Sequence, residues 1–400
     1  MTPQAERNKQ LRIAAGQGNV DAVVQLLRRG ASPLAYSPKH GMTSLHIATV
    51  GLHTDIVRNI LRSYPGACTC RDKKIGATAL HIAVERQKDT ATTTSHVTTT
   101  IQAQQRQEQQ EQQQQPSFAT TLQIVDMFVQ TDPRVVHMTR RDNGSTALHL
   151  ACWQGNTVLA IKLLEAGSNI HARRFDGVTP LWLASCHGHW RTAKILLDHA
   201  ALEETSTTAI TECRRLHRAN FQGKTPLYAA VANTTREHQM TASYLIQHIC
   251  RNTVPTTNAF DPVTLLWQRT NPEHNAWAPI HVACREGNTP VVRALLECLP
   301  QHQRVNSNTE TNNNYNRDHY HNNQQNLVNV RDALGWTPLM LACCNGWVPI
   351  VQLLLHWGAR LDVTNEQGQT AIHLAVEFLD VLYVLLRYHE GLAILKSTSI

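Results

Sequence analysis

The phrase Gly-Ser-Thr-Ala-Leu-His-Leu-Ala at residues 144–151 decides how this chain of 400 residues folds, because the phrase recurs along it. Close copies begin at Gly41 and Gly76. More divergent copies begin at Gly177, Gly223, Ala276, Gly335 and Gly368. The shortest spacing between copies is 33 residues, from 144 to 177 and again from 335 to 368. With a divergent first copy at residues 11–15, the chain holds nine units, and such a period indicates stacked repeats.

Each unit has the same internal order, which predicts two helices. The first Gly permits a tight turn, and the Thr two residues later suits the N-cap of a helix. Four copies place a proline at the first helical position, where its missing N–H costs nothing. These are Pro180, Pro226, Pro279 and Pro338. A second Gly, such as Gly155, ends the first helix, and residues 158–164 show the apolar spacing of a second, amphipathic helix.

The Thr-Pro-Leu-His type of phrase and the 33-residue period resemble the ankyrin repeat, over nearly all of the chain outside its insertions. The resemblance implies an all-α ankyrin-repeat solenoid of stacked helix-turn-helix pairs with β-hairpin fingers. It also implies that partners dock on the concave surface formed by the finger tips and the first helices. One unit cannot bury its apolar face alone, so neighbouring units must stack.

Several units depart from this pattern, the second and the seventh among them. In the second unit, Leu52 stands where a helix-ending glycine is expected. The seventh unit begins Ala276-Trp277-Ala278 and therefore lacks both the turn glycine and the capping threonine. We expect local strain or shifted boundaries in these units.

The spacing of the copies also predicts the domain organisation. Biased, polar insertions cannot bury enough apolar surface to offset the entropy of ordering, so we expect the two low-complexity insertions to be disordered. The predicted order is repeats 1 to 3 (first part) at 5–89, a Thr/Gln-rich insertion at 90–117, repeats 3 to 7 at 118–300 with insertions near 201–219 and 252–275, an Asn/His-rich insertion at 301–328, and repeats 8 and 9 at 329–400. Residues 261–267 have the composition of a short extra helix.

Composition excludes several classes of protein. Hydrophobic residues make up 42% of the chain, which argues against wholesale disorder, and the formal net charge is only +7. No apolar run is long enough to span a membrane, and the first residues lack the apolar run of a signal peptide. Cys152, Cys284 and Cys343 occupy one repeated position and no Cys-x-x-Cys pair occurs, so we expect reduced thiols in a cytoplasmic or nuclear protein.

No catalytic, metal or cofactor motif stands out. Gly223-Lys224-Thr225 ends like a phosphate-binding loop, but Arg218 occupies the place of the earlier glycine. Five histidines share the fourth place of the recurrent phrase, where we expect hydrogen bonds between units rather than metal ligation. They are His46, His81, His149, His281 and His373. We therefore predict a protein that is not an enzyme, with no metal, cofactor or small-molecule substrate.

The predicted finger tips are basic. They carry the candidate partner-binding residues Arg71, Lys73, Arg140, Arg141, Arg173, Arg174 and Phe175. One interpretation is a solvated charged edge; the other is a groove for an acidic or phosphorylated protein segment, to which arginine offers paired donors. Variable positions of the repeat are occupied by Trp153, Trp277 and Trp336. These tryptophans either anchor a partner or pack against a neighbouring finger.

We predict a protein-protein interaction module, as an adaptor, scaffold or inhibitor. Two alternatives stay open: a nucleic-acid or chromatin-associated adaptor, and the regulatory ankyrin portion of a larger enzyme. The small net charge and the lack of a recognition helix disfavour nucleic acid.

Overall fold

The computed structural model describes residues 3–86, 118–202, 215–251, 262–298 and 327–397. The predicted disordered insertion at 90–117 lies outside the described residues, as do residues 301–326 of the second one. Contacts divide the chain into two compact units, unit 1 up to Ala184 and unit 2 from Ser185.

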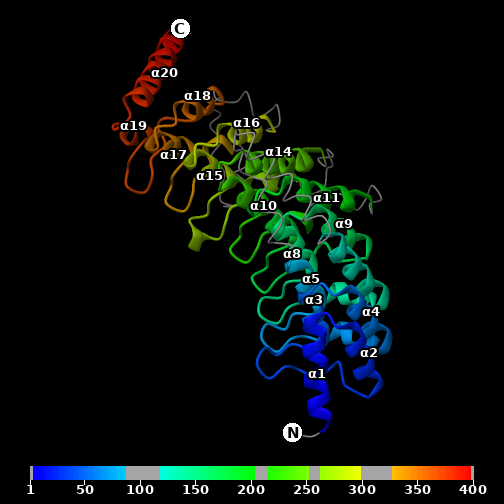
Figure 1. Cartoon of the computed structure of the whole chain (residues 1–400). Coiled ribbons are helices and arrows are strands. Elements are labelled where there is room, and N and C mark those ends of the chain that lie inside the picture. Colours follow the sequence, from blue (N-terminus) through cyan, green and yellow to red (C-terminus); the bar gives the residue numbers. More distant parts are fainter. Residues whose placement is uncertain (1–2, 87–117, 203–214, 252–261, 299–326, 398–400) are drawn as a thin grey trace, which may run out of the picture. The chain divides into compact units, whose positions relative to one another are not determined.

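Unit 1 is built from pairs of short helices. The helices are α1 (Pro3–Gln17), α2 (Val20–Arg28), α3 (Ser44–Val50), α4 (Thr54–Ser63), α5 (Ala79–Glu85), a helix at 118–131, α8 (Ala147–Gln154) and α9 (Thr157–Glu165), with 3-10 turns η1 (Pro65–Thr69) and η3 (Pro133–His137). Helix α10 (Pro180–Cys186) spans the boundary between the units. In Figure 1 the first helices α1, α3, α5 and α8 form one layer, with the second helices α2, α4 and α9 on one side and the fingers on the other.

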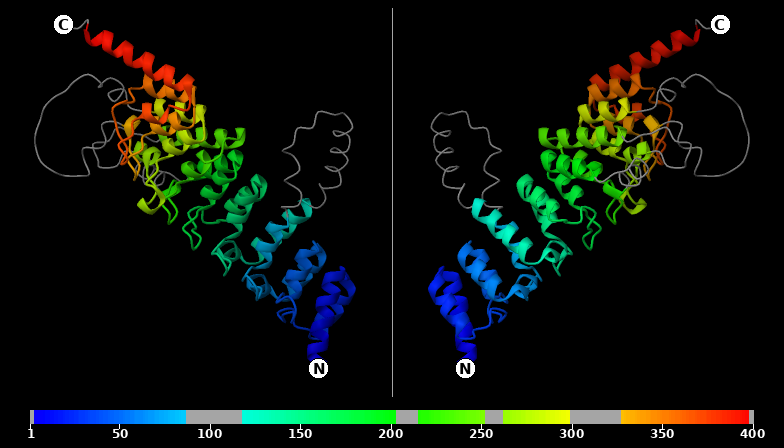
Figure 2. Two further views of the ribbon diagram at one scale, coloured as in Figure 1. Left: turned by 90° about the vertical axis from the view of Figure 1, so that its left-hand side faces the viewer. Right: turned by 90° about the vertical axis from the view of Figure 1, so that its right-hand side faces the viewer.

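Unit 2 continues the same alternation. Its helices are α11 (Trp190–Leu202), α13 (Pro226–Val231), α14 (Arg236–Arg251), α15 (Pro279–Arg285), α16 (Thr289–Glu297), α17 (Pro338–Cys344), α18 (Val348–His356), α19 (Ala371–Leu374) and α20 (Leu379–Ser397), with 3-10 turns η4 (Pro262–Trp267), η5 (Pro272–His274) and η7 (Leu327–Asn329). Together the described helices give the nine pairs that the repeat count predicts, and α20 runs on at the C-terminal end of unit 2 (Figure 2).

The core follows the repeat. First helices pack on their own second helices and on the first helices of their neighbours: α3 contacts α1, α4 and α5, and α15 contacts α13, α16 and α17. The leucine of the recurrent phrase fills this interface. Its copies Leu45, Leu80 and Leu148 are fully buried. Burying such a side chain contributes about 2 kcal/mol, so stability accumulates repeat by repeat. The fold is all-α, as predicted.

The irregular units show the strain that their sequences predict. Leu52 and Ala276 adopt left-handed backbone conformations, with φ of 55° and 50°. Other units place glycine at these positions, because a side chain is disfavoured there. The short extra helix predicted at 261–267 is the 3-10 turn η4, whose Leu266 is fully buried.

Candidate partner-binding surface

The fingers are hairpin-like turns with a common hydrogen-bond register. In the third repeat, the N–H of Asp72 donates to the oxygen of Ala77 at 2.7 Å and closes the finger. The next residue, Lys73, instead donates its N–H to Gly41 of the preceding finger at 3.0 Å. We call this position the tip position. Among the described residues, the Arg71–Thr78 bridge is the only β-type pairing outside the turns, so the fingers are not regular strands.

The same register places three predicted partner-binding residues in equivalent positions. Arg141 donates its N–H to Ile75 at 2.9 Å, and Phe175 donates its N–H to Asn143 at 3.0 Å. Together with Lys73, they occupy the tip position of successive fingers in unit 1. In unit 2 the residues at this position are Phe221, Asn271, Ala333 and Glu366. The described tip positions are thus cationic or aromatic in unit 1 from the third repeat onward and lack cations in unit 2.

Close contact between fingers explains two of the turn glycines. Gly76 has a φ of 67°, and a Cβ atom there would lie 2.4 Å from Cγ of Arg141. At Gly144 an added Cβ would meet the ring of Phe175 at 2.9 Å. The tip side chains therefore lie across the preceding turns. Arg141 stays exposed, and Phe175 is 64% exposed.

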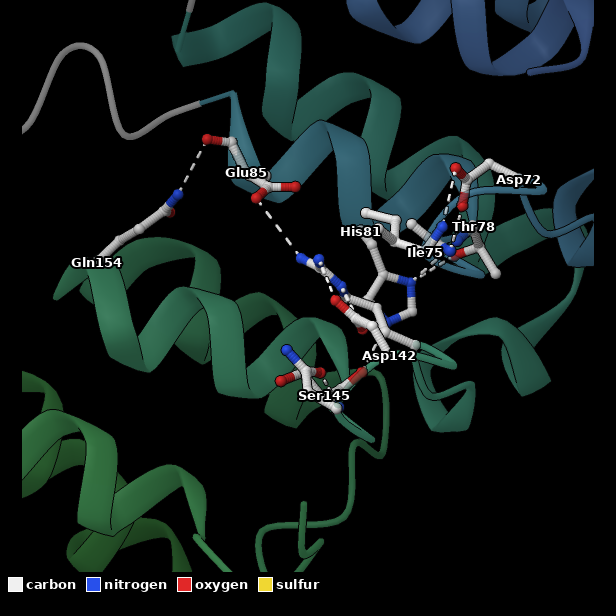
Figure 3. A network of polar contacts seen from close by, with 11 residues as sticks. Asp72, Ile75, Thr78, His81, Glu85, Asp142, Ser145 and Gln154 are labelled. Atoms are coloured by element: carbon white, nitrogen blue, oxygen red, sulfur yellow. Dashed lines mark hydrogen bonds and ion pairs between the residues drawn. The ribbon is translucent and has the colours of Figure 1, made fainter. Parts of the chain in front are cut away.

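Arg140 has a different environment from its neighbour Arg141. Its side chain is only 10% exposed and its guanidinium binds Asp142 at 2.7 Å and Glu85 at 3.5 Å. The amide of Gln154 donates to the main-chain oxygen of the same Glu85 at 3.1 Å (Figure 3). This guanidinium joins the third and fourth repeats of the chain.

The remaining predicted arginines also bind within the fingers. Arg71 donates to the main-chain oxygen of Thr139 in the next finger. Arg174 pairs with Asp176 at 3.4 Å, and Nε of Arg173 donates to the oxygen of Gly177 at 3.1 Å. Their charges are partly engaged by the protein itself.

Four of the five histidines of the recurrent phrase contact the next repeat, as predicted: His46, His81, His149 and His281. His373, in the last repeat, contacts Thr370 of its own repeat. Nδ1 of His81 lies 2.8 Å from the hydroxyl of Thr78, and Nε2 lies 3.1 Å from the main-chain oxygen of Ser145 in the next repeat (Figure 3). Burial lowers the pKa of His81 to about 4, and it does the same for His149 and His281. A neutral ring with its proton on Nε2 satisfies both contacts.

A hollow of about 590 Å³ opens in unit 1 beside the first fingers. It is lined by Ala5, Asn8, Lys9, Arg12, Ile13, Ala35, Tyr36, Ser37, Pro38 and Ile47. Ile13 is 48% exposed there, so the hollow offers apolar as well as cationic surface. Arg12 donates to the main-chain oxygen of Ala35 at 3.3 Å, and burial lowers the pKa of its guanidinium.

Tyr36 connects this hollow to the tip positions. Nζ of Lys73 lies 4.8 Å from the centre of the Tyr36 ring, at cation–π distance. Burial raises the pKa of the Tyr36 hydroxyl, and the positive charge of Arg141 opposes that rise. We call Lys9, Arg12, Tyr36, Lys73 and Arg141 the basic hollow.

Acidic groups near the basic hollow already have partners. The Asp72 carboxylate is buried and accepts the backbone N–H of Ala77 at 2.6 Å and that of Lys74 at 3.2 Å. Asp142 pairs with Arg140. Among the ion pairs of the described residues, none involves Lys9, Lys73 or Arg141.

The three predicted tryptophans are all half-buried, in two different units. Trp153 lies near the end of α8 in unit 1. In unit 2, Trp277 donates Nε1–H to Asp332 at 2.9 Å and the guanidinium of Arg285 lies 4.6 Å from its ring. The main chain of Trp336 donates to the same Asp332 at 2.7 Å. Trp277 and Trp336 thus take part in contacts between or within fingers.

Lys9, Arg12 and Tyr36 are not among the binding residues predicted from the sequence. Tyr36 precedes the tip position of the first finger by two residues, as Arg71 precedes Lys73 in a later one, so aligning the fingers by their closing bonds would have found it. In the part of the chain that the structure describes, no three His, Cys, Asp or Glu side chains gather as metal ligands, and no helix has the length and apolar character to cross a bilayer.

Comparison with known proteins agrees with this architecture. A family model described as ankyrin repeats (3 copies) matches residues 11–93, 117–208, 159–255 and 318–395, and one described as ankyrin repeat matches residues 275–304. These matches cover well over half of the chain and include both units.

The individual relatives share only about a quarter of their residues with this chain over the matched segments. The ankyrin repeat protein nuc-2 of Neurospora crassa is 25% identical over 251 residues, which cover 58% of this chain and 20% of the relative. The probable E3 ubiquitin-protein ligase XBOS32 of Oryza sativa is 23% identical over 254 residues, covering 62% and 38%. Transient receptor potential cation channel subfamily A member 1 of Homo sapiens is 25% identical over 182 residues, covering 46% and 13%. The chain spans less than two fifths of each of these relatives.

Proposed function

Because the chain belongs to the ankyrin-repeat family, we propose that it is a non-enzymatic interaction module whose basic hollow binds an acidic or phosphorylated protein segment. The observation that carries this proposal is the contrast between the tip positions. Lys73 and Arg141 are exposed cations in unit 1, whereas the equivalent positions in unit 2 carry no cation.

The partner's chemistry follows from the lining of the hollow and from the two cationic tip positions. Lys73 and Arg141 lie on successive fingers, so they can contact carboxylates or phosphates spaced along an extended chain. Lys9 lines the hollow from α1. Ile13, Tyr36 and Ile47 provide apolar surface for one side chain between these charges. We therefore propose an extended acidic segment with an apolar residue among its acidic ones.

The charges that hold the fingers together are excluded from this contact. Arg140 and Arg174 are paired with carboxylates of their own fingers, and breaking those pairs to bind a partner carries a cost. Exposed and uncompensated cations raise the rate of association with an acidic partner and make it sensitive to salt. Arg141 and Lys73 fit this role better than Arg140.

The test is a selection of random linear peptides displayed on phage against the native chain. We expect enrichment of peptides that combine Asp or Glu with a large apolar residue. Their binding should weaken with added salt and fall at least tenfold in the double variant Lys73→Glu, Arg141→Glu. Phosphoserine versions of the selected peptides then separate a preference for phosphate from one for carboxylate.

A matched control carries the same change of charge elsewhere in unit 1. Arg28 and Arg62 are exposed on the second helices α2 and α4, on the side opposite to the fingers (Figure 1). The variant Arg28→Glu, Arg62→Glu should bind like the native chain. Equal loss in both variants, or selection of peptides without acidic residues, contradicts the proposal. Tighter binding to unrelated duplex DNA than to any peptide favours a nucleic-acid-associated adaptor.

We place this module in the cytoplasm or nucleus. None of the nine described cysteines is in a disulfide bond, and reduced cysteines are typical of reducing compartments.

A further inference from the structure

We infer that Cys250 and Cys298 form a redox modification site, at which a peroxide oxidises two thiols to a disulfide that joins neighbouring repeats. This inference concerns unit 2 and is independent of the basic hollow. It rests on the relative position of two side chains that are 48 residues apart in sequence.

The fold brings these two cysteines together. Cys250 lies in the last turn of α14, and Cys298 is the residue directly after α16. These are the second helices of adjacent repeats, and they pack against each other in unit 2. Their Sγ atoms lie 2.6 Å apart, and both residues are half-buried. The two sulfurs therefore meet at a place that a small oxidant can reach.

The reaction needs one peroxide and no further group from the protein. The thiolate of one cysteine attacks a peroxide oxygen, the O–O bond breaks, and a sulfenic acid and hydroxide form. The second thiolate then attacks the sulfenic sulfur, the S–S bond forms, and hydroxide leaves. The two thiol protons combine with the two hydroxides, so two thiols and hydrogen peroxide give one disulfide and two waters.

Other described cysteines are less suited to this chemistry. Cys152 and Cys284 are fully buried and Cys343 is buried, and burial raises the pKa of all three thiols. A raised thiol pKa lowers the thiolate fraction that attacks a peroxide. Cys344 is half-buried, but its Sγ donates to the main-chain oxygen of Leu341. Among the described cysteines, the Cys250–Cys298 pair combines access with a second sulfur in contact.

The disulfide would change the mechanics of unit 2. Neighbouring repeats are held by side-chain packing, and repeat arrays open locally at such interfaces. A covalent bond between the ends of α14 and α16 suppresses this opening in both helices. Oxidation would thus stiffen two adjacent repeats without changing their contacts.

The test treats the full chain with hydrogen peroxide, blocks the remaining thiols with N-ethylmaleimide and digests without reduction. Trypsin releases Cys250 in the peptide of residues 237–251 and Cys298 in that of residues 294–304, each with a single cysteine. We expect these two peptides joined, minus two hydrogen atoms, at a yield independent of protein concentration. Dithiothreitol should separate them.

Variants show whether the bond has the proposed effect. Hydrogen exchange in α14 and α16 should slow at least threefold on oxidation in the native chain and in Cys344→Ser. It should not slow in Cys250→Ser or Cys298→Ser. Circular dichroism of the reduced proteins confirms that each serine variant keeps its helix content.

Three results overturn the inference. The first is a joined peptide in which Cys250 or Cys298 pairs with another cysteine, such as Cys213. The second is oxidation of both residues to sulfinic acids without a joined peptide. The third is faster oxidation of Cys186 or Cys344, which are also half-buried, while Cys250 and Cys298 stay fully alkylated.

Discussion

Nε2 of His81 lies 3.1 Å from the main-chain oxygen of Ser145, although the two residues are 64 positions apart in sequence. The other ring nitrogen accepts hydrogen bonds from Thr78, which caps the helix that carries His81. One imidazole thereby orders its own helix and the next finger. Nδ1 can accept from Thr78 only while the ring is neutral, so protonation of His81 removes the contact that orders its own helix and leaves a buried charge.

The stability of the chain should fall as the pH drops through 6.5. Burial lowers the pKa of His81 to about 4, below its usual 6.5. The unfolded chain therefore binds a proton more readily than the folded one. The stabilising effect is complete above pH 6.5 and is lost progressively toward pH 4. Between pH 7 and pH 5 each such histidine should cost on the order of 2 kcal/mol of unfolding free energy, measured by urea denaturation.

A substitution separates this effect from the titration of carboxylates. The eighth repeat has Met340 in the place of the histidine, and that side chain is buried in the same way. His81→Met should therefore be less stable at pH 7.5 but lose less stability on acidification. Parallel pH profiles for His81→Met and the native chain would show that the ring does not titrate as described.

Relieving backbone strain should stabilise the seventh repeat. Ala276 holds a φ of 50°, where glycine carries no steric penalty. Ala276→Gly should raise the unfolding free energy of unit 2 by about 1 kcal/mol, measured by chemical denaturation. The reciprocal control is Gly335→Ala, at φ 78°, where an added Cβ would lie 3.2 Å from the backbone of Asn365. That variant should be destabilised, and a stabilising effect of it would contradict the assigned strain.

Arg140 and Arg141 should respond differently to truncation. Arg140→Ala removes a largely buried guanidinium from Asp142 and Glu85 and should lower the unfolding free energy by about 2 kcal/mol. Arg141→Ala removes an exposed side chain and should change stability by no more than about 0.5 kcal/mol. We expect Arg141→Ala to lower the affinity of the folded protein for acidic peptides. If Arg140→Ala costs no stability, its guanidinium does not join the repeats.

Much of the fold could be predicted from short phrases. The threonine that caps a helix and the histidine three residues later act within one helical turn, as at Thr78 and His81. Such contacts depend only on residues that are close in sequence, so the phrase predicts them wherever it recurs. The irregular copies could also be interpreted. Leu52 and Ala276 stand where other units have glycine, and both adopt the left-handed backbone conformation that glycine adopts there.

The candidate site could be predicted only in part. The basic fingers were visible in the sequence, but not that Arg140 is buried against Asp142 while the adjacent Arg141 is exposed. The exposure of a finger side chain depends on which face of the finger packs against the next repeat. Insertions of unequal length between repeats make the equivalent finger positions hard to align in the sequence. Tyr36 was missed for the same reason, since its contact with Lys73 joins two different fingers.

The sequence by itself determined the class of fold, the number of repeats and the role of the recurrent histidines, because these follow from local hydrogen bonds and apolar periodicity. Only the tertiary structure decided which cations are left for a partner and which sulfurs meet. The contact of Cys250 with Cys298 arises from the packing of α14 on α16, and their separation of 48 residues in sequence gives no indication of it. Side-chain neighbours between repeats are a property of stacking, and stacking is specified jointly by all the residues of an interface.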